Sequence, residues 1–105
     1  MSNIIDNPYV EADMTKNFLC RLYNEDNNSI EVKTNGMNPF DIWHVLNYNA
    51  YDQLVVPVIL NQIISNNVDK GFITFNSETR RVYLTEAGRR WSELNCGASA
   101  SRLSL

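Results

Sequence analysis

The sequence predicts a single, mainly helical α+β domain, and two observations lead to this expectation. The chain has 105 residues, 44% of them hydrophobic, which is enough for one compact core and too little for two domains of ordinary size. Apolar residues recur at spacings of three and four over long stretches, whereas β-branched and aromatic runs are short. We therefore expect a core of three helices, a short strand, one hairpin and a further helix.

The first helix is expected to run from Tyr9 to about Tyr23, after an N-terminal arm over residues 1–8. A turn rich in Asn and Asp, residues 24–29, should end it. The alternation of apolar and charged residues in Ile30–Lys33 predicts a short, half-buried strand. The buried face of the first helix would consist of Met14, Phe18, Leu19, Leu22 and Tyr23.

The second helix is predicted to follow Asn38, which can cap it with Pro39 in the first position. A third helix should run to about Asn67. A proline inside a helix costs about 3 kcal/mol unless it lies in the first turn, so Pro57 moves the expected start from the cap at Asp52 toward Val56. The inward stripe of this third helix would consist of Val56, Ile59, Leu60, Ile63 and Ile64.

Residues 72–75 and 81–84 are predicted to form a two-stranded hairpin, because both are β-branched and aromatic and Asn76–Thr79 between them suits a turn. Thr85 can then cap a last helix. Residues 95–105 show no periodicity and are expected to be a disordered tail, so the domain spans residues 9–94. The apolar side of the last helix would consist of Ala87, Trp91 and Leu94.

The motif Leu84-Thr85-Glu86-Ala87-Gly88-Arg89, directly after the hairpin, resembles the end of the wing and the start of the last helix in MarR-like and PadR-like bacterial regulators. The resemblance covers roughly residues 9–94 and is strongest over residues 70–94. It implies a winged helix-turn-helix fold with a three-helix core, a two-stranded wing and a C-terminal helix. It also implies that the third helix enters the major groove of DNA while the wing contacts the backbone or minor groove.

On this resemblance, the leading hypothesis is a homodimeric transcription regulator that binds double-stranded DNA. Asparagine and glutamine side chains pair with adenine edges, and guanidinium groups bind phosphate or a narrow minor groove. Residues 70–90 also carry a local excess of three positive charges. The expected DNA contacts are Asn61, Gln62 and Ser65 on the third helix, and Lys70, Arg80, Arg81 and Arg89 around the wing.

Two observations favour an alternative, a winged-helix protein-interaction or dimerisation module that does not bind nucleic acid. The net charge is −3, and no Lys or Arg lies between Lys33 and Lys70, although phosphate contacts dominate affinity for DNA. Leu54 and Val58 add apolar side chains to a second side of the third helix, which indicates burial against a partner or a second copy.

Catalysis and metal binding are not expected. His44 is the only histidine, and although Asp41 could orient its imidazole, there is no second His or nearby Cys for a zinc site and no Gly-rich phosphate loop. Trp43 and Trp91 are expected to be core anchors. No cofactor is predicted.

A cytoplasmic location is expected, since residues 1–8 hold no basic residue for a signal peptide. The longest apolar run, Leu54–Leu60, has seven residues, whereas a membrane-spanning helix needs roughly 20. In a reducing compartment the two cysteines would be thiols, with Cys20 in the core and Cys96 incidental.

Overall fold

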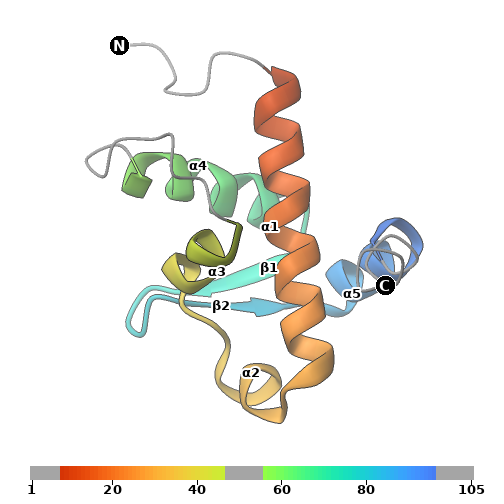
Figure 1. The fold of residues 1–105 in the computed structure, drawn as a ribbon. Coiled ribbons are helices and arrows are strands. Elements are labelled where there is room, and N and C mark those ends of the chain that lie inside the picture. The colour runs from red at the N-terminus through yellow and green to blue at the C-terminus, as the bar shows by residue number, and fades with distance from the viewer. Residues whose placement is uncertain (1–7, 47–55, 97–105) are drawn as a thin grey trace.

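The computed structural model describes residues 8–46 and 56–96, and it is mainly helical there, with one small antiparallel sheet (Figure 1). The α+β, mainly helical class is therefore confirmed. Predictions for residues 1–7, for the connection over 47–55 and for residues 97–105 lie outside the described residues. The elements in chain order are α1 (Pro8–Asn28), α2 (Ile30–Asn35), α3 (Pro39–Leu46), α4 (Val56–Asp69), β1 (Ile73–Asn76), β2 (Arg81–Leu84) and α5 (Glu86–Asn95).

Helix α1 separates α3, α4 and the hairpin tip from α5, which lies on its other side (Figure 1). Its predicted stripe is buried at Met14, Phe18, Leu19 and Leu22, while Tyr23 is half-buried. The whole predicted stripe of α4 is buried against it. Burial of each such large aliphatic or aromatic side chain contributes about 1.5–3 kcal/mol, so these two stripes provide most of the core.

The predicted helix starts are confirmed at three places. Asn38 accepts a hydrogen bond from the Phe40 N–H through its side-chain oxygen, at 2.9 Å, and α3 begins at Pro39. α4 begins at Val56, which places Pro57 in the first turn, where its missing N–H costs no helical hydrogen bond. Thr85 caps α5 by accepting a hydrogen bond from the Gly88 N–H at 3.0 Å.

The predicted strand at Ile30–Lys33 is wrong, because this segment forms helix α2. Ser29 caps the helix by accepting a hydrogen bond from the Val32 N–H at 3.2 Å. Gly36 ends it with φ of 73°, a left-handed conformation that glycine adopts without a steric cost. The alternating pattern did not reflect two sheet faces, since Ile30 is 81% exposed.

The segment after this helix, at Met37, rather than the helix itself, pairs with the sheet. β1 and β2 are antiparallel, with Ile73 opposite Leu84. Met37 and Val82 exchange two backbone hydrogen bonds of 2.9 Å each, so the chain entering α3 lies beside β2 as a single bridge.

The predicted inner side of α5 is wrong at Ala87 and Leu94, which are both exposed. The inner side instead carries the small residues Gly88 and Ser92. A Cβ at Gly88 would overlap the backbone carbonyl oxygen of Phe72, so α5 packs close to the start of the hairpin only because this position is glycine.

Both tryptophans were expected in the core. Trp43 is buried, as predicted. Trp91 is half-buried and packs against Phe72, with the ring centroids 5.3 Å apart. It therefore anchors α5 at the edge of the core rather than inside it.

The expectation of two free thiols is also wrong, because Cys20 and Cys96 form a disulfide with a Cα–Cα distance of 5.6 Å. Cys20 lies in the middle of α1, and Cys96, only 2% exposed, follows the last residue of α5. The bond therefore ties the C-terminal end of α5 to α1 across 76 residues of sequence.

Reduction of this disulfide is expected to lower the free energy of unfolding by about 2 to 4 kcal/mol, because the bond removes loop entropy from the unfolded chain. Urea unfolding with and without a thiol reductant measures this change. The double variant Cys20→Ser/Cys96→Ser should show the lowered stability and no response to reductant. Equal unfolding midpoints of the wild type in both buffers would contradict the expectation.

Candidate binding surface

The exposed side of α4 carries no charged side chain from Val56 to Val68. Asn61 and Ser65 are exposed there and Gln62 is half-buried, so all three predicted polar contacts lie at or near the surface. Val58 is 51% exposed, as the interface prediction requires. The other predicted interface residue, Leu54, lies outside the described residues.

The tip of the hairpin is a hydrogen-bonded turn that includes the backbone of Arg80. The side-chain oxygen of Asn76 accepts hydrogen bonds from the N–H groups of Glu78 and Thr79, at 2.9 and 3.1 Å. The Arg80 N–H donates to the Asn76 carbonyl at 2.7 Å. Arg80 has a φ of 60°, the only positive φ of a non-glycine residue in the described part of the chain.

A groove of about 350 Å³ lies between the start of α3, one side of α4 and the hairpin. We call it the α4–hairpin groove. Its apolar walls are Pro39, Phe40, Pro57, Leu60, Ile64 and Phe75. Its polar lining consists of Asn38, Asn61, Thr79 and Arg80.

Among the described residues, Arg80 is the only charged residue that lines this groove and no carboxylate lines it, so the charge of this lining is positive. The N-terminal ends of α3 and α4 both border it, through Pro39 and Pro57. Helix N-termini carry a partial positive charge, so both ends favour negative charge at this place.

Phe40 and Phe75 are aromatic residues of the groove that the sequence did not indicate as part of a binding surface. They are 41% and 38% exposed, although each belongs to a segment with a buried side. Phe75 shares its strand face with the buried Ile73 but lies one step nearer the turn, beyond the core. An aromatic residue directly before the turn at Asn76 was the available signal.

Arg81 and Arg89, two of the predicted DNA contacts, are engaged within the molecule. The Arg81 guanidinium donates to the carbonyl oxygens of Asn35 and Gly36, at 2.9 and 3.4 Å, and so holds the end of α2. Arg89 forms an ion pair of 2.7 Å with Asp26. Lys70, by contrast, is exposed, in the turn between α4 and β1.

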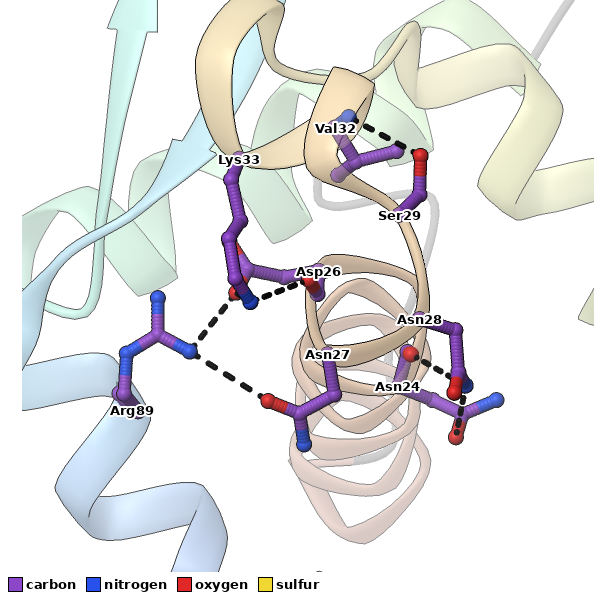
Figure 2. Close-up of polar contacts among 8 residues, drawn as sticks. All are labelled: Asn24, Asp26, Asn27, Asn28, Ser29, Val32, Lys33 and Arg89. Atoms are coloured by element: carbon purple, nitrogen blue, oxygen red, sulfur yellow. Dashed lines mark hydrogen bonds and ion pairs between the residues drawn. The ribbon is translucent and has the colours of Figure 1, made fainter.

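Figure 2 shows Asp26 between Lys33 of α2 and Arg89 of α5. The Asp26 side chain is only 4% exposed. Lys33 Nζ lies 3.1 Å from the carboxylate and donates to the Asp26 backbone carbonyl at 2.6 Å. Burial alone would raise the pKa of Asp26, but hydrogen bonds from Arg89 and Lys33 outweigh it and hold this pKa below its ordinary value.

Among the cations from residue 70 to 90, all in the described part of the chain, only Lys70 and Arg80 have no ion pair or hydrogen bond from their side chains. Arg90 pairs with Glu86 on the exposed side of α5. Arg81, Arg89 and Arg90 thus each have a partner within the molecule, which leaves Lys70 and Arg80 as the described cations of this region without one.

His44, with Asp41 to orient its imidazole, was the one residue considered for catalysis or metal binding, and neither function was expected. His44 and Asp41 are both exposed on α3. No cluster of three or more His, Cys, Asp or Glu side chains suited to a metal occurs over residues 8–46 and 56–96. In the same residues, every helix is too short or too polar to cross a membrane.

Comparison of this chain with protein-family models, curated proteins and solved structures finds no significant match. The resemblance to MarR-like and PadR-like regulators therefore rests on the motif Leu84–Arg89 and on the order of elements.

Asp26→Asn is expected to destabilise the fold by roughly 2 kcal/mol, since it leaves two cations beside a neutral group, while their partial exposure reduces the cost below that of a fully buried pair. Because the folded-state pKa of Asp26 is lowered, its contribution is present above the ordinary carboxyl pKa and is lost as pH falls through the lowered value. Stability measured against pH should therefore fall more steeply below about pH 4 in the wild type than in the variant.

Glu86→Gln is the matched control, since it removes an exposed ion pair whose side chains are 70% and 76% exposed. It should leave stability at neutral pH almost unchanged. Equal losses in the two variants would contradict the central role of Asp26.

Proposed function

We propose that this chain is a winged-helix module that binds a protein partner through the α4–hairpin groove, without catalytic chemistry. Four features support the winged-helix assignment: the order of helices, the bridge between Met37 and Val82 at the position of the first strand, the hairpin, and the cap at Thr85. In such a domain α4 is the exposed third helix of the core and β1–β2 is the wing.

The apolar lining of the groove is the observation that carries the binding proposal. Phe40 and Phe75 remain about two-fifths exposed beside a helix whose outer side also exposes Val58. Contiguous exposed apolar surface with a polar rim is typical of sites that bind another molecule.

The charges favour a protein over DNA as the partner. A typical DNA-binding protein neutralises about 6 to 10 phosphates with its cations. Its affinity therefore falls about 10³- to 10⁵-fold between about 50 and 200 mM salt. Only Lys70 and Arg80 are unpaired cations of the hairpin region, and β1 separates them. Two cations cannot replace the phosphate counterions along a DNA groove.

The homodimeric DNA-binding regulator is the second candidate, and one observation favours it. Asn61 and Arg80 line the same groove, so a base-reading amide and a phosphate-binding cation lie on one side of the molecule. The two candidates differ in their response to salt.

Binding to mixed-sequence duplex DNA should be weak, and it should fall only about tenfold between 50 and 200 mM salt if the two unpaired cations make all the phosphate contacts. Fluorescence anisotropy with a labelled duplex at the two salt concentrations measures this. A loss of a thousandfold or more would establish DNA as the partner and overturn the protein-binding proposal. Solution mass, determined in parallel, tests the homodimer.

Partner binding should depend on the groove. Immobilised wild type and the Ile30→Ser variant, which changes an exposed apolar residue on α2, should retain the same protein from an extract of the source cells. Phe75→Ser should lose it, because the substitution removes one apolar wall of the groove. Retention by all three proteins would show that the groove is not the binding surface.

The cytoplasmic location is also a proposal, and the disulfide removes one argument for it, since cytosolic thiols are usually kept reduced. Rapid acid quenching of cells followed by thiol alkylation reports whether Cys20 and Cys96 are bonded in the cell.

A further inference from the structure

We infer that the segment held in the α4–hairpin groove is an acidic peptide with a bulky apolar anchor, whose carboxylate pairs with Arg80. This inference rests on the proposed protein-binding function and adds the chemistry of the partner.

The volume of the groove matches apolar side chains. An engineered cavity of about 150 Å³ binds benzene, so a groove of about 350 Å³ has room for one or two bulky side chains. Leu60 and Ile64 form its floor, since both are buried in the domain, and Phe40 and Phe75 stand at its edges, since both are partly exposed. An aromatic or leucine side chain therefore gains burial on several sides at once.

The positive charge of Arg80 favours a peptide with an acidic residue close to its apolar anchor. Arg80 is exposed, and in the described part of the chain its side chain has no intramolecular partner and no other charged residue lines the groove. Its planar guanidinium binds a carboxylate through two parallel hydrogen bonds. Glu78, two residues before Arg80, and Asp41, next to the groove residue Phe40, are both exposed and do not line the groove.

The turn sets the backbone conformation of Arg80 at the edge of the groove. Hydrogen bonds to Asn76 set the turn, and the positive φ of Arg80 persists although glycine would adopt it at lower cost. Arg80→Gly therefore removes the guanidinium without weakening the hairpin, which makes it a clean variant for binding measurements.

The test begins with a random dodecapeptide library displayed on phage, selected against the oxidised full chain and depleted on Phe75→Ser. Enriched peptides are expected to place Trp, Phe or Leu within four positions of Asp or Glu. A synthetic peptide of the enriched consensus should bind about tenfold more weakly to Arg80→Gly and to Arg80→Gln, whereas the control Lys70→Gln should bind it like the wild type.

A double-mutant cycle decides whether the carboxylate and Arg80 meet. Replacing the acidic residue of the peptide by its amide should cost about tenfold with the wild type and almost nothing further with Arg80→Gln. Two results would overturn the inference and leave the protein-binding function standing. One is enrichment of groove-dependent peptides without an acidic residue. The other is an equal loss of affinity, for the wild type and for Arg80→Gln, when the acidic residue of the peptide is replaced by its amide. Failure to enrich any groove-dependent peptide would overturn both.

Discussion

The buried carboxylate of Asp26 is the contact on which the arrangement of α1, α2 and α5 depends. It lies in the last turn of α1, where the helix dipole disfavours negative charge, and burial adds a desolvation cost. Lys33 and Arg89 offset both costs with ion pairs of 3.1 and 2.7 Å. The cations that satisfy Asp26 also bring α2 and α5 against α1.

The same network decides which surface is free to bind. Arg89 is paired with Asp26, and Arg81 donates to the carbonyl groups at the end of α2, so both guanidinium groups already have partners within the molecule. The disulfide from Cys20 to Cys96 fixes the other end of α5. What remains around α4 and the hairpin is an apolar groove whose described lining holds one cation, Arg80, and this is the surface at which we propose that another protein binds.

The core could be predicted from the sequence because helical periodicity is a local property. The stripe from Val56 to Ile64 is buried, and the caps at Asn38 and Thr85 start their helices where expected. The strand at Ile30–Lys33 could not be predicted correctly, because four alternating residues fit a strand or one turn of helix equally well. The cap from Ser29 and the hydrogen bond from Lys33 to Asp26 stabilise the helix.

The sequence by itself determined the mainly helical class, the inner faces of α1 and α4, and the hairpin, since each depends on residues close together in the chain. Only the tertiary structure decided the partners of Asp26, the bond between Cys20 and Cys96, and the inner side of α5. These features depend on which residues distant in sequence come into contact. Gly88 is an example: it lies on the inner side of α5 because the Phe72 carbonyl beside it leaves no room for a Cβ. The groove was likewise decided only by the tertiary structure, because Phe40 and Phe75 line one groove only when α3, α4 and the hairpin pack together.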